Sequence, residues 1–346
     1  MLANLNKLDL PRSVDSPAVI PKAPTPEAFN SILTLTHSLE IATTSPVPRW
    51  HHWFALKFYP SLVSAGKHKD KLIRDRLEGA WQKFTKAPST ERKVSSALDY
   101  IVQREVTMAK KENRPPQYDT PAIKDELFGF LIAGHDTTST TITWGLKHLT
   151  TNQQVQSKLR SALRAHYKRA HEAGEMPTVE EIVKADIPYL DATIEEFSRL
   201  GNTASANMRR ALCDTEVLGY QIPKGTDVFM LNSGPGYTMS PLYVDDSKRS
   251  KSSLDTKDRY GMWETADIGA FQPERWLEKN EKGEMEFNPR AGPTHPFGAG
   301  PRGCFGRKLA QMELEIMFTL VLWNFELQST PADLSSFAGV DILTHM

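Results

Sequence analysis

The stretch "HPFGAGPRGCFGRKLA", His295–Ala310, decides the fold. It places Cys304 in a loop of glycine, proline and arginine, directly before a long apolar segment. Glycines on both sides remove side chains from around the cysteine, so a bulky flat group can approach the backbone there. A cysteine at the start of a helix and beside Arg302 is well placed to form a thiolate, which is a soft metal ligand. The stretch therefore predicts a loop that offers one sulfur to a flat, metal-containing group.

Two other interpretations of Cys304 stay open at this point. Free cysteines are commonly buried and structural, but the surrounding glycines argue against a packed environment. A catalytic nucleophile needs a base, and His295 is the only histidine in the loop.

Composition limits the class of protein. The chain has 346 residues, with 42 Lys plus Arg and 42 Asp plus Glu, so its net charge favours neither nucleic acid nor an anionic membrane as a partner of the whole molecule. Two cysteines, Cys213 and Cys304, make neither a disulfide framework nor a zinc site. No apolar run reaches the roughly 18 residues of a membrane span, and the N-terminus lacks the features of a signal peptide. We therefore expect an intracellular protein without a membrane span in this chain.

The pattern of the chain predicts one mainly α domain with a small β portion over residues 28–346. Residues 1–27 are rich in proline and turn formers and are expected to be a poorly ordered lead-in. A capping box is expected from Thr178 to Glu181, and a hairpin is expected around Pro223 and Gly225. Apolar periodicity predicts helices over residues 67–84, 91–111, 155–174, 188–200 and 307–327.

Residues 128–146 break the usual rules for a helix. Six of the seven residues from Thr137 to Thr143 carry hydroxyl groups, which compete for backbone carbonyls and would bend a helix. Asp136 and Thr137 together offer a carboxylate and an alcohol that can pass protons through water. The alternative is a Ser/Thr-rich helix end that is capped by Asp136, and this segment alone does not choose between the two.

Glu196 and Arg199 lie three residues apart on one face of an expected helix. Most pairs with this spacing are solvated surface ion pairs. However, Glu196 lies next to the apolar stripe of the same helix. A partly buried pair would need further hydrogen-bond partners, which an arginine elsewhere in the chain can provide.

These motifs resemble those of the cytochrome P-450 haem-thiolate monooxygenases, of the eukaryotic microsomal and fungal type. Phe297, Gly300, Arg302, Cys304 and Gly306 meet the signature Phe-x-x-Gly-x-Arg-x-Cys-x-Gly in full. Residues 133–138 are similar to the oxygen-activation motif, Glu196 to Arg199 to the Glu-x-x-Arg motif, and Arg275 in "FQPERW" to its distant arginine partner. The motifs occur in the order that the family shows, which makes chance agreement very improbable.

The resemblance implies roles for individual residues. Cys304 would be the axial ligand of the iron of haem b, and Phe297 would pack near the thiolate and tune it. Arg302 and Arg209 would each pair with a haem propionate. Asp136 and Thr137 would deliver protons during oxygen activation. Glu196, Arg199 and Arg275 would form a buried structural network.

The resemblance also implies an activity: insertion of one oxygen atom from O2 into an apolar small molecule, possibly of secondary metabolism. Electrons would come from NADPH through a cytochrome P-450 reductase. The match covers the C-terminal two-thirds of the family fold, and the N-terminal anchor that holds such proteins on the endoplasmic reticulum has no counterpart here. The alternatives are a truncated remnant that cannot retain haem and a haem-thiolate isomerase or dehydratase.

Overall fold

The computed structural model describes residues 24–86, 93–201, 203–259, 261–263, 267–339 and 344. The described chain forms two compact units that divide between Asp136 and Thr137, within helix α6 (Pro121–Thr151). Most of the expected lead-in lies outside the described residues, and the first helix begins at Glu27. The single domain expected over residues 28–346 stays a prediction.

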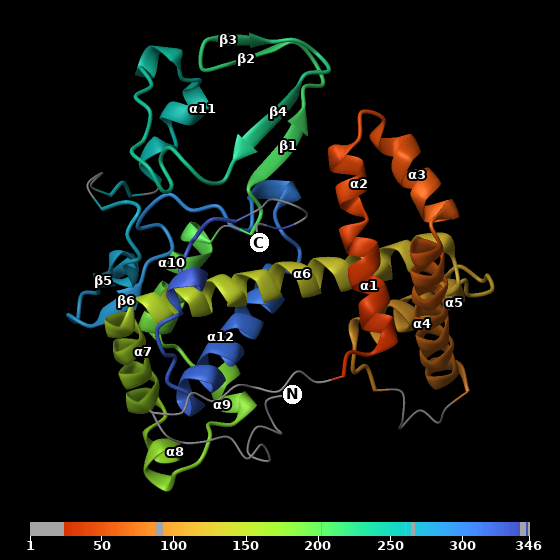
Figure 1. The fold of residues 1–346 in the computed structure, drawn as a ribbon, viewed down its shortest axis with the longest axis horizontal. Helices are drawn as coiled ribbons and strands as arrows, with labels where there is room; N and C mark the ends of the chain where they lie inside the picture. Colours follow the sequence, from red (N-terminus) through yellow and green to blue (C-terminus); the bar gives the residue numbers. More distant parts are fainter. Residues whose placement is uncertain are drawn as a thin grey trace. The chain divides into compact units, whose positions relative to one another are not determined.

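The first unit is helical and contains the N-terminal part of α6. Proline occupies the first position of α3 and of α4. A backbone N–H group at this position has no acceptor within the helix, so its absence in proline costs no hydrogen bond. Helix α4 packs against α1, α3 and α5, as can be followed in Figure 1. The helices expected over 67–84 and 91–111 are confirmed, the first with an earlier start at Pro60 and the second with a later start at Ala97. The helices are α1 (Glu27–His37), α2 (Leu39–Thr44), α3 (Pro48–Phe58), α4 (Pro60–Thr85) and α5 (Ala97–Lys111).

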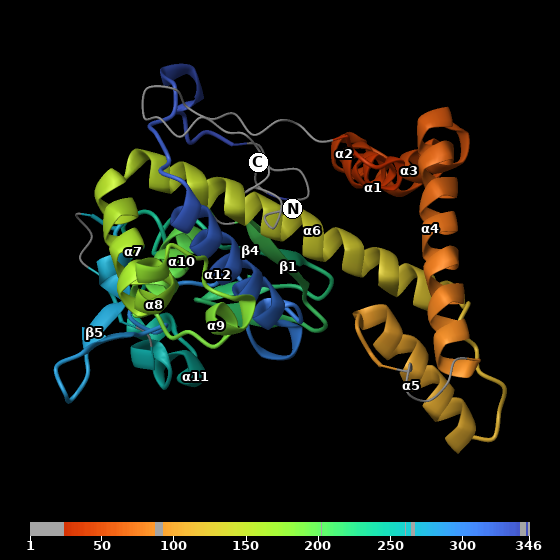
Figure 2. The same ribbon diagram turned by 90° about the horizontal axis from the view of Figure 1, so that it is seen from below.

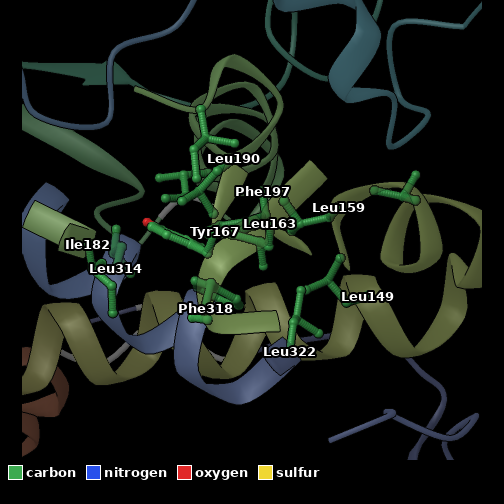
Figure 3. Packing of buried hydrophobic residues seen from close by; sticks show 14 residues of the cluster. Leu149, Leu159, Leu163, Tyr167, Ile182, Leu190, Phe197, Leu314, Phe318 and Leu322 are labelled. Atoms are coloured by element: carbon green, nitrogen blue, oxygen red, sulfur yellow. The ribbon is translucent and has the colours of Figure 1, made fainter. Parts of the chain in front are cut away.

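The second unit packs its helices around one apolar core, which Figure 3 shows from close by. Phe318 and Phe197 approach α6 so closely that a Cβ atom on Gly145 would lie 2.5 Å from the Phe318 ring. Glycine at this position is therefore a requirement of the packing. Around this core lie the C-terminal part of α6, α7 (Gln153–His166), α9 (Val179–Val183), α10 (Pro188–Leu200) and α12 (Arg307–Asn324).

The residues expected to begin and end helices in the second unit are confirmed, but one expected helix is wrong. Thr178 and Glu181 form the expected capping box, and Pro188 occupies the first turn of α10. The single helix expected over 155–174 is wrong, because the chain breaks at Tyr167 and continues as α8 (Lys168–Ala173). Gly174 ends α8 with a φ of 68°, as a C-terminal glycine should.

The β portion is small, and the expected hairpin is wrong in its pairing. Strand β4 (Asp227–Leu231) pairs with β1 (Ala206–Arg210), and β2 (Thr215–Val217) pairs with β3 (Tyr220–Ile222). The tight turn lies at Leu218 and Gly219, which both have positive φ, and not at Pro223 and Gly225. A third pair joins β5 (Leu277–Lys279) to β6 (Met285–Phe287). Figure 1 shows the β2–β3 pair at the tip of the ribbon formed by β1 and β4.

Short helical turns occupy the segments between these elements. They are η3 (Asp246–Lys248), α11 (Lys251–Leu254), η4 (Lys257–Arg259), η5 (Pro273–Trp276), η6 (Gly300–Arg302) and η7 (Ala332–Leu334). Figure 2 shows α12 as the helix that crosses the second unit beside α7 and α10. The expected mainly α class is confirmed. Among the helices described, none combines the length and the apolar character that crossing a bilayer requires.

Candidate active site

The Cys304 loop (His295–Gly306) is held by its own backbone. The amide of Cys304 donates to the carbonyl oxygen of Phe297 at 2.7 Å, and Gly303 donates to Gly300 at 3.0 Å. Gly298 and Gly300 have φ values of 62° and 66°, which side chains other than glycine adopt only under strain. The thiol is exposed, three residues before the start of α12. The loop therefore presents one sulfur from a fixed backbone.

Space beside this sulfur is kept open. A cavity of about 400 Å³ is lined by Cys304, Phe297, the loop glycines and Arg307. A Cβ atom on Gly306 would lie 3.8 Å from the Cys304 sulfur, in van der Waals contact with it, so glycine leaves this side of the thiol uncovered. These observations fit a flat group whose metal is bound by the sulfur.

Glu195 is a buried carboxyl group at the same cavity. It is 5% exposed and accepts a hydrogen bond of 3.0 Å from the Thr294 hydroxyl group. Burial raises the pKa of Glu195, and the Thr294 hydrogen bond and the charge of Arg307 oppose this rise. Glu195 thereby joins α10 to the segment that enters the Cys304 loop.

The two arginines expected to bind carboxylate groups of a cofactor are both exposed. Arg302 lies in η6 within the loop, and Arg209 lies on β1, where it donates to the carbonyl oxygen of Met208 at 2.9 Å. In the part of the chain that the structure describes, neither forms an ion pair with a carboxylate of the protein. Phe297 lies beneath the guanidinium of Arg307, 5.6 Å from the ring centre.

Asp136 and Thr137 lie within α6 and not at its end, so the interpretation of Asp136 as a helix cap is wrong. Asp136 is buried and Thr137 is exposed. The hydroxyl of Thr141 donates to the carbonyl oxygen of Thr137 at 2.9 Å, which satisfies the hydroxyl without interrupting the helix. The division between the two units falls between Asp136 and Thr137.

Glu196, Arg199 and Arg275 are brought together in one buried network. Arg199 binds both oxygens of Glu196, at 2.9 and 2.8 Å, and Arg275 Nε lies 3.0 Å from Glu196 Oε1. The side chains of Glu196 and Arg199 have no exposed surface. Arg199 also donates to the carbonyl oxygens of Tyr237 and Ile268. The surface ion pair that spacing alone favours is therefore wrong.

Comparison with known proteins agrees with these motifs. The family model described as "Cytochrome P450" matches residues 22–237 and 262–341. The chain belongs to the cytochrome P450 family. A cytochrome P450 monooxygenase of Pestalotiopsis microspora is 46% identical over 92% of this chain, and one of Fusarium sporotrichioides is 37% identical over 96%. The chain covers 56% and 59% of those two proteins.

Two further similarities concern a shorter relative and a solved structure. The chain is 36% identical over 78% of its length to a cytochrome P450 monooxygenase of the Hps1-dma1 cluster of Dothistroma septosporum, and it covers 90% of that protein. The crystal structure of the cytochrome P450DA heme domain aligns with a TM-score of 0.56 and 21% identity, over 94% of this chain and 58% of that one. At this identity the solved structure supports the P450 fold alone.

The buried network around Glu196 contains further residues that the sequence analysis did not identify. The indole N–H of Trp276 donates to Glu196 Oε2 at 2.9 Å, and the backbone N–H of Gln272 donates to Glu196 Oε1 at 2.9 Å. The Trp263 ring lies 5.1 Å from the Arg199 guanidinium and 4.8 Å from that of Arg275. The only available signal was that Trp276 directly follows Arg275 in "FQPERW".

Proposed function

We propose that this P450 chain binds haem b through the thiolate of Cys304 and belongs to an enzyme that inserts one oxygen atom into an apolar small molecule. The observation that carries the proposal is the Cys304 loop, with an exposed thiol at the edge of a cavity that its glycines leave open. Among the described residues, no group of three or more His, Cys, Asp or Glu side chains could hold a metal ion. A single sulfur suits haem, because the porphyrin itself supplies four nitrogen ligands to the iron and the protein needs to add only one.

The residues present fit this cofactor. The thiolate is the donor, and the hydrogen bond from the Cys304 amide to Phe297 keeps it at one place in the loop. Arg302 and Arg209, which lack carboxylate partners in the described chain, are available for the two propionates. Phe297 lies in the same loop as the sulfur and would pack near it once haem is bound. Haem, when bound, supplies the iron that activates O2.

Asp136 and Thr137 take part in moving protons. Insertion of one oxygen atom consumes two electrons and two protons, converts R–H and O2 to R–OH and releases water. A buried carboxylate beside an exposed hydroxyl can relay these protons from solvent through water. The network around Glu196 does not touch the reacting atoms. It holds α10 against the segment that contains Arg275 and therefore supports the scaffold beside the loop.

The electron donor, the substrate class and the location rest on the family. Electrons come from NADPH through a reductase, and the protein resides at the endoplasmic reticulum. The name of one relative, from Dothistroma septosporum, places that protein in a gene cluster. The substrate of the present protein is an apolar molecule of secondary metabolism. These statements are proposals for the whole protein. The present chain spans a little over half the length of the first two relatives above.

The test is spectroscopic. The purified chain is reconstituted with haem, reduced and exposed to carbon monoxide, and we expect the red-shifted Soret band that thiolate-ligated ferrous haem gives. Cys304→Ser should abolish this band, because a hydroxyl group does not replace the thiolate as a ligand. Cys213→Ser, which removes the other exposed cysteine, should leave the band unchanged.

Three outcomes would contradict the proposal. A folded chain that binds no haem would support the truncated remnant, and a band that survives Cys304→Ser would exclude this cysteine as the ligand. Turnover that does not depend on NADPH and reductase would favour an isomerase or dehydratase instead.

A further inference from the structure

Glu195 and Glu196 are neighbours on α10 that contact two different parts of the second unit. Successive side chains of a helix point about 100° apart, so neighbouring residues do not share a face. Glu196 accepts its hydrogen bonds within the buried network. Glu195 lines the cavity beside Cys304, and its Oε1 atom lies 3.0 Å from the hydroxyl oxygen of Thr294, which donates to it. Glu195 therefore acts on the loop and not on the network.

The two residues that flank the Cys304 loop both interact with Glu195. Thr294 directly precedes the loop, and Arg307 directly follows it as the first residue of α12. Arg307 lines the same cavity as Glu195. Burial raises the pKa of Glu195, and the positive charge of Arg307 is one of the influences that oppose this rise. One carboxyl group thus acts on both ends of the loop, by a hydrogen bond where the loop begins and by charge where it ends.

Arg307 extends these contacts to the residue beside the sulfur. Its guanidinium carbon lies 5.6 Å from the centre of the Phe297 ring. The carbonyl oxygen of Phe297 in turn accepts the hydrogen bond of the Cys304 amide at 2.7 Å. A series of contacts therefore leads from Glu195 through Arg307 and Phe297 to the backbone of Cys304.

Packing alone does not account for a carboxyl group at this place on α10. Glu195 is 5% exposed. Taking a carboxyl group out of water is costly unless its contacts compensate, and an apolar side chain would fill the same space without this cost. The interactions with Thr294 and Arg307 give the physical reason for Glu195 at this position.

We propose that Glu195 is a positioning residue for the sulfur ligand, which holds both ends of the Cys304 loop and thereby sets how firmly the loop retains haem. The part of this inference that concerns haem rests on the proposed function, whereas the order of the loop can be measured without haem. Loss of the Thr294 hydrogen bond would let the loop adopt more backbone conformations. The sulfur would then spend less time at the place where it can act as a ligand, and binding would weaken.

The first experiment measures the order of the loop in the full chain without haem. Hydrogen–deuterium exchange of residues 295–306 is followed by mass spectrometry in wild type and in Thr294→Val, which has a similar volume but no hydroxyl group. We expect exchange in the loop to be about tenfold faster in Thr294→Val, because one hydrogen bond to a carboxyl group changes an equilibrium by about this factor. Thr294→Ser keeps the hydroxyl group and should exchange like wild type.

The second experiment measures how fast the haem-loaded chain transfers its haem to an excess of apomyoglobin. Thr294→Val and Glu195→Leu should each release haem about tenfold faster or more. The double variant should release it no faster than Glu195→Leu alone, because both changes remove the same hydrogen bond. Glu195→Gln keeps an acceptor for Thr294 and loses only the charge that acts on Arg307, so its rate should lie between those of wild type and Glu195→Leu.

Thr193→Val is the matched control on the same helix. Thr193 is completely buried, and its hydroxyl group donates to the carbonyl oxygen of Tyr189 at 2.6 Å, within α10. The same chemical change at this position should lower the stability of the chain. It should leave both the exchange of the loop and the release of haem unchanged.

The failures of the two proposals are distinguishable. Loop exchange that is the same in Thr294→Val and wild type, or that Thr193→Val accelerates equally, would overturn the role of Glu195. Additive effects of Thr294→Val and Glu195→Leu on haem release would overturn it as well. A wild-type chain that shows the expected exchange but no red-shifted band with carbon monoxide would contradict the proposed function and would still support the positioning of the loop by Glu195.

Discussion

The buried network around Glu196 and the loop around Cys304 lie in the same unit, and they are built in opposite ways. Glu196 has no exposed surface and accepts N–H groups from Arg199, Arg275, Trp276 and the Gln272 backbone. Cys304 is exposed, and its backbone N–H group donates to the carbonyl oxygen of Phe297. One region uses nearly every polar atom to hold the fold, and the other keeps a reactive atom open.

The two regions should therefore respond differently to mutation. Removing one partner of a buried charge is costly, because the groups that remain lose a hydrogen bond that no water can replace. A glycine-rich loop on the surface loses little stability when it is changed, but it loses the shape that a ligand needs. Mutations in the network should therefore lower mainly the stability, and mutations in the loop should lower mainly the binding of the cofactor.

The largest effect is expected for Trp276→Phe. The change removes the N–H group that donates to Glu196 Oε2 at 2.9 Å, in a side chain that is completely buried. A hydrogen bond to a charged group contributes about 1.5–3 kcal/mol, and the smaller ring adds a packing loss. We expect the free energy of unfolding, measured with denaturant, to fall by about 2–4 kcal/mol.

Trp263→Phe is the matched control for this prediction. The Trp263 indole nitrogen is buried and has no hydrogen-bond partner among the described residues. Phenylalanine keeps an aromatic face toward Arg199 and Arg275 and removes an unsatisfied donor. Its loss of stability should be smaller by at least about 1 kcal/mol. Equal losses for the two variants would show that the Trp276 hydrogen bond contributes nothing specific.

Trp276 also shows where prediction from sequence ends. The Cys304 loop, the Thr178 capping box and the start of α10 at Pro188 depend on residues within a few positions of one another, and local patterns report them. The contact between Trp276 and Glu196 spans 80 residues and obeys no helical or strand period. Likewise, the tight turn at Leu218 and Gly219 joins β2 to β3, and β4 pairs with β1, which lies before that hairpin in the chain. Spacing alone could not decide whether Glu196 was buried, because burial depended on these distant partners.

Helix α10 carries a second partly buried carboxyl group, Asp191. Asp191 lies one turn before Glu195 but has no cation as a partner in the described structure. Burial, with the charges of Glu315, Asp186 and Glu195, raises the pKa of Asp191 to about 7. Between about pH 4 and pH 7 the folded protein holds a proton that the unfolded chain releases, so stability falls as pH rises through this range.

Asp191→Asn should remove this penalty. The variant should equal wild type near pH 4 and should be more stable by about 1–2 kcal/mol at pH 8, a value reduced for the partial exposure of the group. Thermal unfolding measured at both pH values tests the sign. Asp255→Asn, at an exposed position, is the matched control. A gain for Asp191→Asn that is the same at both pH values would indicate a packing effect and not a titration.

The smallest change in stability, and the clearest separation from function, is expected for Gly300→Ala in the Cys304 loop. Gly300 has a φ of 66° and Gly174, at the end of α8, has a φ of 68°, and a Cβ atom at either position would meet no atom within 4 Å. Alanine should therefore cost the same backbone strain at both positions, about 1 kcal/mol in unfolding measurements. Only Gly300→Ala alters the loop that presents the sulfur, so only this variant should reduce the carbon monoxide band per folded molecule. If both variants kept the full band, the loop would tolerate the change in its backbone. Binding of the cofactor would then depend on the Cys304 thiol and not on the shape of the loop.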